Sequence, residues 1–178
     1  MIQRKTMDDL GRIAPQHTAT APRHPFIVIL DDVRSMQNVG SAFRTADAFA
    51  IQALYLCGYT PQPPHRDIHK TALGATDTVP WQHFPTVTAA IQHAMALGYH
   101  IAAVEQAHGS TQLHQLPTTM PPTALIFGNE VTGVSDEALS LAQSSIEIPQ
   151  WGAKHSLNIS VSLGVVLWEL VRLSDLGR

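Results

Sequence analysis

The side chains best suited to chemistry gather directly after four short apolar runs of the sequence. In a parallel α/β sheet, ligands bind beyond the carboxyl ends of the strands. If each run is a strand, the four polar segments that follow share one pocket. The segments contain Asp31, Asp32, Arg34, Asn38, Gly40 and Arg44; then Glu105; then Asn129, Glu130, Thr132 and Gly133; and finally Pro149, Gly152, Lys154, His155, Ser156 and Asn158.

This predicted pocket lacks the motifs of common nucleotide-binding and hydrolytic sites. The sequence contains no G-x-x-x-x-G-K-[ST] P-loop, no G-x-G-x-x-G fingerprint and no G-x-S-x-G nucleophile elbow. Ten histidines raise the alternative of a metal site. The pair His65 and His69, however, has no cysteine or clear carboxylate to act as a third ligand. We interpret the pair as surface histidines and expect no metal.

Hydrophobic patterning predicts an α/β fold with a mostly parallel sheet and flanking helices. The run "FIVIL" at 26–30 does not alternate, which indicates a strand buried on both faces. Residues 59–78 are rich in proline and glycine and are predicted to form a long loop with one short helix. The predicted strands are 26–30, 53–58, 100–105, 124–128 and 145–149, and the predicted helices are 39–49, 86–98, 134–142 (capped by Ser135) and 157–173.

The last predicted helix carries two apolar stripes. A helix with two apolar faces needs two partners. One partner is the sheet, and the other is either more of the core or the same helix in a second copy of the chain. The first stripe is Ile159, Leu163, Val166 and Leu170, and the second is Val161, Val165 and Trp168.

Length and composition fit one domain with a real core. The chain has 178 residues, 44% of them hydrophobic, and no apolar run approaches the roughly 20 residues that cross a bilayer. Cys57 is the single cysteine, and the N-terminus has no apolar signal region, so a cytoplasmic setting is expected. We expect residues 1–24 to be a polar arm with one helical turn around 7–12, and residues 25–178 to be a single domain.

The positive charge is concentrated in the first part of the chain. Residues 1–70 contain eight Lys or Arg and six Asp or Glu, whereas residues 71–178 contain three and eight, within a formal net charge of −3. This distribution suits either an anionic partner held locally or an ordinary solvated surface. The basic residues of the first part are Arg4, Lys5, Arg12, Arg23, Arg34, Arg44, Arg66 and Lys70.

Three segments together resemble the SpoU (TrmH-type) family of RNA ribose 2′-O-methyltransferases, within the SPOUT superfamily. They are "NVGSAFRTADAF" at 38–49, "LIFGNEVTGVSDEAL" at 125–139 and "IEIPQWGAKHSLNISVSLGVVLWE" at 146–169. They occur in the order of the family motifs and span roughly residues 25–170. The chain resembles a stand-alone catalytic domain, without the additional RNA-binding domain of many relatives.

The resemblance implies a C-terminal deep trefoil knot that holds S-adenosylmethionine, and a homodimer whose active site takes residues from both subunits. The substrate would be tRNA or rRNA, with tRNA preferred as a compact target. Matching the motifs assigns catalytic roles to Asn38, Arg44, Glu130, Ser156 and Asn158. The cofactor would contact the chain at Val104, Gly128, Ile148, Ser156 and Leu157, of which Val104 lies outside any strong motif.

Arg44 is the first candidate for catalysis. Its guanidinium stays protonated and suits bidentate contact with a phosphate, so we expect it to fix the target phosphate and stabilise charge on the 2′-oxygen. Proposals for the family also allow it to act as the base, which needs a strongly perturbed pKa. The alternative without catalysis is a surface salt bridge to Asp47 at i+3.

The other motif residues also have structural alternatives. Asn38 could cap the helix that carries Arg44, Ser156 could cap the last helix, and Glu130 could orient Asn38 or the start of a neighbouring helix. Asn158 would lie in the first turn of the last helix, near free backbone N–H groups. At the level of the whole chain, the alternative function is a catalytically silent RNA-binding paralogue; a metal hydrolase is the weaker third hypothesis.

Overall fold

The apolar run near residue 26 forms an interior strand of the sheet, buried on both faces as predicted. In the computed structural model, which describes residues 2–6, 8–14, 17–18 and 20–174, this strand is β1 (His24–Asp31). Phe26, Val28 and Leu30 pack in the core on one side of the sheet, and Ile27 and Ile29 pack in the core on the other. All five side chains are at most 1% exposed, which explains the absence of polar alternation.

The sheet has seven strands in the order β3-β2-β1-β6-β4-β7-β5, and all its pairings are parallel. The five predicted strands are present, within a few residues at their ends. Two strands were not predicted because they are too short to show a pattern: β3 follows Pro80, and β5 has two residues. The remaining strands are β2 (Ile51–Cys57), β3 (Trp81–Phe84), β4 (His100–Val104), β5 (Thr111–Gln112), β6 (Thr123–Phe127) and β7 (Ser144–Glu147).

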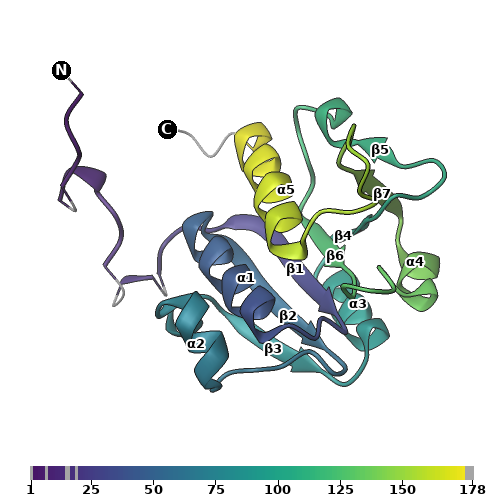
Figure 1. Cartoon of the computed structure of the whole chain (residues 1–178), viewed down its shortest axis with the longest axis horizontal. Helices are drawn as coiled ribbons and strands as arrows, with labels where there is room; N and C mark the ends of the chain where they lie inside the picture. The colour runs from purple at the N-terminus through teal and green to yellow at the C-terminus, as the bar shows by residue number, and fades with distance from the viewer. Residues whose placement is uncertain (1, 7, 15–16, 19, 175–178) are drawn as a thin grey trace.

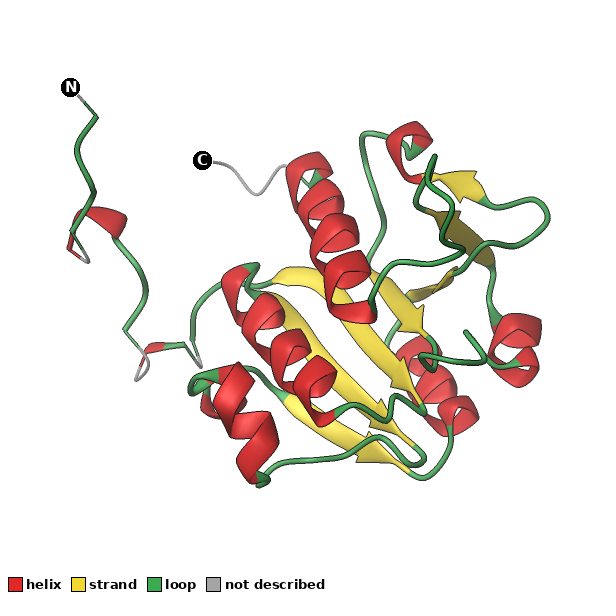
Figure 2. Cartoon of the chain, viewed as in Figure 1, coloured by secondary structure: helices red, strands yellow, loops and turns green. Residues whose placement is uncertain are grey.

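Helices cover both faces of this sheet (Figures 1 and 2). The helices α1, α2 and α5 pack on the face that holds Phe26, while α3 and α4 pack on the other. The short helix expected in the 59–78 loop is α2. The bounds are α1 Met36–Ala48, α2 Arg66–Ala72, α3 Val87–Ala96, α4 Asp136–Leu141 and α5 Ile159–Leu173, with 3₁₀ turns at Asp8–Leu10, Ala75–Asp77 and Leu113–Gln115.

Two of the predicted helix caps are wrong, and the third is correct. The side chain of Ser35, not Asn38, caps α1 by accepting the N–H of Asn38. Asn158, not Ser156, caps α5. Ser135 caps α4 as predicted. Each true cap lies at the residue where the backbone turns from extended to helical, and sequence patterns locate that point only to within a few residues.

The two stripes of α5 have different surroundings. Leu163, Val166 and Leu170 are fully buried, as the first stripe predicts. The second stripe is unprotected in the single chain: Val161 is 50% exposed, Val165 39% and Trp168 59%. Trp168 contacts Phe49, whose ring centroid lies 6.3 Å away.

The segment before β1 extends away from the sheet in Figure 1. Its junction with the sheet is fixed by Arg23, whose guanidinium donates to the carbonyls of Thr18, Ile51 and Thr78. The expected helical turn is present as the 3₁₀ turn at Asp8–Leu10. Residues 1, 7, 15–16, 19 and 175–178 belong to the expected arm and domain but lie outside the described residues. No described helix has both the length and the hydropathy of a membrane span.

Helices α1 and α2 pack closely against each other at Gly40. A Cβ at this position would lie 2.0 Å from Thr71 Oγ1 and 2.4 Å from the backbone oxygen of Ile68. Ala in place of Gly inside a helix ordinarily stabilises a protein by about 0.5–1 kcal/mol. At Gly40, the clash with the Ile68 backbone outweighs this gain, so the substitution is expected to destabilise the protein.

We therefore predict that Gly40→Ala lowers the free energy of unfolding by about 1–3 kcal/mol, the usual cost of overpacking. Urea denaturation measures it. Ser41→Ala, on the next residue of the same helix, is the control and is expected to change stability by less than about 0.5 kcal/mol. A Gly40→Ala protein as stable as the parent contradicts the close packing of α1 on α2.

Candidate active site

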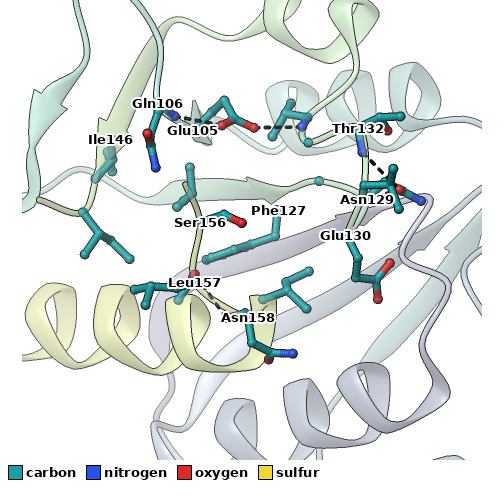
Figure 3. Close-up of a pocket in the computed structure, with 18 of the residues that line it drawn as sticks. Glu105, Gln106, Phe127, Asn129, Glu130, Thr132, Ile146, Ser156, Leu157 and Asn158 are labelled. Carbon is teal, nitrogen blue, oxygen red and sulfur yellow. Dashed lines mark hydrogen bonds between the residues drawn. The ribbon is translucent and has the colours of Figure 1, made fainter. Parts of the chain in front are cut away.

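A pocket of about 630 Å³ lies at the carboxyl edge of the sheet (Figure 3). This volume is within the range of small-molecule sites. The loops that follow β4, β6 and β7 form its walls, together with the start of α5. Three of the four predicted segments therefore share the pocket, whereas the segment after β1 contributes no lining residue. The lining residues are Val104 to Gln106, Phe127 to Val134, Asp136, Leu139, Ile146, Ile148, Gln150, Ser156 to Ile159 and Ser162.

The wall after β6 is a closed loop. The backbones of Asn129 and Gly133 donate to each other at 2.9 and 3.0 Å, and Asn129 Oδ1 accepts the N–H of Val131 at 2.9 Å. Gly128 is required here, because a Cβ on it would lie 2.0 Å from the carbonyl carbon of Gly133. Asn129 Nδ2 also donates to the carbonyl of Asp32 at 2.6 Å, which ties this loop to the end of β1.

The carboxylate of Glu130 lies in front of the N-terminus of α1. Its Oε2 accepts the N–H of Arg34 at 3.0 Å, and its Oε1 accepts the N–H of Ser35 at 3.0 Å. Asn38 Nδ2 donates to the same Oε1 at 2.8 Å. Glu130 therefore makes the contacts that orienting either Asn38 or a helix start would require, and the positive end of the helix dipole favours a carboxylate at this place.

These contacts also change the acidity of Glu130. Partial burial by itself would raise its pKa, but the hydrogen bonds from the Arg34 backbone, the Asn38 amide and the Ser35 backbone outweigh burial and lower it. The Glu130 carboxyl is therefore ionised over a wider pH range in the folded chain than in the unfolded one.

Asn38 connects the N-termini of α1 and α5. While its Nδ2 binds Glu130, its Oδ1 accepts a hydrogen bond from Asn158 Nδ2 at 3.2 Å. Asn158 in turn caps α5 through Oδ1, which accepts the Ser160 N–H at 2.8 Å. The line Glu130–Asn38–Asn158 therefore connects the loop after β6 to the starts of α1 and α5.

The pocket brings together most of the residues predicted for it. All five predicted cofactor residues line it, and so do Glu130 and Asn158; Asn38 lies one hydrogen bond behind them. The predicted cofactor residues are Val104, Gly128, Ile148, Ser156 and Leu157. Gln106 was not predicted, because it belongs to no motif; its place directly after a strand was the one available signal.

Arg44 is not among the residues that line the pocket of its own chain. It is exposed on α1, six positions after Asn38, and thus more than one turn further along the helix. The alternative salt bridge with Asp47 is wrong. The two ion pairs in the described part of the chain join Lys70 to Asp67 and Arg172 to Glu169, while Asp47 accepts a hydrogen bond from the Thr78 hydroxyl at 2.6 Å.

The charge of the pocket is acidic. Its lining includes Glu105, Glu130 and Asp136, and none of the described lining residues is Lys, Arg or His. An acidic wall above an apolar floor suits a ligand with both positive charge and apolar surface, and it disfavours a polyphosphate. Within the described ranges no group of three or more His, Cys, Asp or Glu side chains could hold a metal ion. His65 has a different role, since its Nδ1 accepts the Asp67 N–H and caps α2.

The lowered pKa of Glu130 predicts a pH-dependent contribution to stability. A carboxyl whose folded pKa lies below its unfolded pKa of about 4.3 stabilises the fold above that pH and loses the effect as pH falls through the folded pKa. Glu130→Gln replaces one acceptor by an amide that faces backbone donors. We expect it to cost roughly 1 kcal/mol at pH 7, less than is usual for a charged hydrogen bond because Glu130 is largely exposed to solvent.

Urea denaturation between pH 7 and pH 3 tests this prediction, and the stability gap between the parent and Glu130→Gln is expected to narrow toward pH 3. Glu147→Gln is the control, because no hydrogen bond to the Glu147 side chain occurs within the described chain. A gap that is the same at both pH values contradicts the assignment.

Comparison with known proteins gives a consistent result. Residues 25–168 match the model of the SpoU rRNA Methylase family. The tRNA (guanosine(18)-2′-O)-methyltransferase of Escherichia coli K12 is 30% identical over 153 residues, which are 85% of this chain and 66% of that protein. A 23S rRNA (guanosine-2′-O-)-methyltransferase of Vibrio vulnificus is 30% identical over 93% of this chain and 64% of its own length.

The comparison with solved structures agrees with the comparison of sequences. The AdoMet-bound rRNA methyltransferase of Sinorhizobium meliloti superposes with a TM-score of 0.78 at 29% identity, over 85% of this chain and 57% of that one. This chain therefore spans about two thirds or less of the length of these relatives. The family model nevertheless covers most of the chain, including every residue that lines the pocket. The chain belongs to the SpoU rRNA Methylase family.

Proposed function

We propose that this chain transfers a methyl group from S-adenosylmethionine to a ribose 2′-hydroxyl of tRNA or rRNA. The observation that carries the proposal is the pocket: in a member of the SpoU family, the second and third motif segments close one acidic cavity at the carboxyl edge of a parallel sheet. The relatives support it, since they methylate ribose in tRNA and in 23S rRNA by name. Relatives of both kinds match about equally well, so the proposal covers both classes of RNA.

S-adenosylmethionine fits the chemistry of this pocket. Its sulfonium and ammonium groups are both positive and suit the acidic wall, while its adenosyl part suits apolar lining such as Phe127 and Ile146. When bound, it supplies a methyl group that the sulfonium charge has already activated. We propose that backbone and side chains of the predicted cofactor residues hold it: Val104, Gly128, Ile148, Ser156 and Leu157.

The remaining task of the chain is to align the ribose hydroxyl and to stabilise the charge that develops on its oxygen. Alignment alone can supply several kcal/mol of the barrier. We assign the charge stabilisation to Arg44, whose guanidinium would hold the neighbouring phosphate, leaving the hydroxyl proton to that phosphate or to water. Asn38, Glu130, Ser156 and Asn158 shape the edge of the pocket that the ribose would approach.

The same geometry favours a homodimer with shared sites. Arg44 does not line the pocket of its own chain, so an Arg44 from a second copy is the simplest way to bring this side chain to the reaction. The exposed stripe Val161, Val165 and Trp168 on α5 is an apolar surface that a second α5 could cover. We propose that α5 pairs with its twin and that each pocket receives Arg44 from the partner.

We also propose the deep trefoil knot of the family for the C-terminal segment. What supports it is the path of the chain after β7. That strand lies between β4 and β5, yet α5 packs back against α1 on the other side of the pocket. On the way the chain passes the loop after β4, where Gln106 Nε2 donates to the carbonyl of His155.

For the rest of the chain, we propose one catalytic domain at 25–178 and an RNA-contacting arm at 1–24. The family match begins at residue 25, and the arm carries Arg4, Lys5 and Arg12. Arg66 and Lys70 lie on α2, the short helix of the 59–78 segment, and are further candidates for phosphate contact. A tRNA is our preferred substrate, and the cytoplasm our proposed location.

Mass-spectrometric mapping of ribose methylation in total RNA tests the function. We expect one 2′-O-methylated nucleoside to be lost when the protein is deleted and restored when it is returned. Purified protein that binds S-adenosylmethionine but methylates no RNA pool would support the silent paralogue instead. Activity that a chelator leaves unchanged would exclude the metal hydrolase.

The proposed role of Arg44 predicts that its substitution lowers turnover but not cofactor affinity. Lysine keeps the charge but not the bidentate geometry, so Arg44→Lys is expected to lower kcat by roughly 100-fold or more while changing cofactor affinity less than twofold. Methyl-transfer kinetics and calorimetric titration measure the two effects. The control is Arg172→Lys, at a surface pair with Glu169. Full turnover by Arg44→Lys rejects the role.

A further inference from the structure

We propose that Gln106 is a positioning residue that holds the loop at 149–157 over the pocket, with Glu105 as its anchor. This inference rests on the proposed function only for the identity of the ligand. Neither residue belongs to a family motif segment, and both line the pocket (Figure 3).

The loop at 149–157 has very little support of its own. From Trp151 to Asn158 every residue is exposed, although Ser156 and Leu157 reach the pocket. Within the described chain, a single hydrogen bond joins residues 149–157 to other residues: Gln106 Nε2 donates to the carbonyl of His155 at 2.7 Å. After that point the next anchor is Asn158, which binds Asn38 and caps α5.

Glu105 fixes the position from which Gln106 reaches across. Its Oε1 accepts the backbone N–H of Gln106 at 2.9 Å, and its Oε2 accepts the backbone N–H of Val134 at 3.0 Å. The space beside Oε2 depends on Gly133, because a Cβ there would lie 2.5 Å from this oxygen. One dipeptide therefore binds the wall after β6 through a carboxylate and the loop after β7 through an amide.

The consequence is that the three walls of the pocket are joined through Glu105 and Gln106. A pocket whose walls are already in place binds its ligand without the entropic cost of ordering them. Ser156 and Leu157 follow His155 directly, so the bond at His155 sets their position. Loss of the amide donor is expected to weaken ligand binding and to leave the chemical step unchanged once the ligand is bound.

Gln106→Glu is the sharpest variant, because it keeps the shape of the side chain but cannot donate, and it places a negative charge against a carbonyl. Gln106→Ala removes the contact without adding charge and covers the case in which the glutamate variant folds poorly. Gln92→Glu, an exposed residue of α3 on the opposite face of the sheet, makes the same chemical change as a control.

Two measurements together test whether Gln106 holds the loop at 149–157. Limited trypsin digestion followed by intact mass analysis reports cleavage after Lys154, which lies inside the loop, and this rate tracks how often the loop is open. Calorimetry with S-adenosylmethionine, and methyl-transfer kinetics with an RNA substrate found by the mapping above, report binding and turnover.

We expect both Gln106 variants to be cleaved after Lys154 about five- to tenfold faster than the parent, and to bind S-adenosylmethionine five- to tenfold more weakly. The KM for the cofactor is expected to rise accordingly, with kcat within twofold of the parent. Gln92→Glu is expected to match the parent in every assay.

Parental cleavage rates and affinities in both variants overturn the inference. Faster cleavage with an unchanged cofactor Kd also overturns it, because Gln106 would then hold the loop without positioning the residues that bind the ligand. If the parent itself binds no S-adenosylmethionine, the proposed function fails, but the cleavage rates still decide whether Gln106 holds the loop.

Discussion

The amide of Asn38 is the contact on which the organisation of this site depends. One side chain donates to Glu130 and accepts from Asn158, at 2.8 and 3.2 Å. Because Glu130 also accepts two backbone N–H groups that precede α1, and Asn158 caps α5, this bridge sets the start of both helices relative to the loop after β6. Side chains that could act on a substrate thus also form the hydrogen bonds that connect the loops and helices around the pocket.

The parallel sheet explains why such connecting hydrogen bonds are needed. Seven parallel strands bring their carboxyl ends to one edge, where each chain segment leaves the sheet with free backbone groups. Asp31, for example, accepts the N–H of Ser135 at 3.0 Å, and Asn129 donates to the carbonyl of Asp32. Short polar side chains at strand ends satisfy these groups, and what remains between the loops is a cavity with an acidic wall. The parallel arrangement of the strands therefore accounts both for the position of the pocket and for the polar side chains around it.

The outline of the fold and most of the pocket could be predicted from the sequence, because continuous apolar runs identify buried strands and the motif segments identify their ends. Three features could not. The strands β3 and β5 depend on their neighbours for pairing, since four and two residues are too few to show a pattern. The caps at Ser35 and Asn158 depend on where the backbone turns. The contact of Gln106 with His155 joins positions 49 residues apart, and nothing local to either residue indicates it.

The central claim is that the cavity between the loops after β4, β6 and β7 is the binding site of the methyl donor. A crystal structure of the chain grown with S-adenosylmethionine tests this claim most directly. We predict density for the cofactor between Val104, Gly128 and Leu157, with its sulfonium toward the edge formed by Asn38 and Glu130. A cofactor bound elsewhere on the chain, with this cavity filled only by water, would contradict the account.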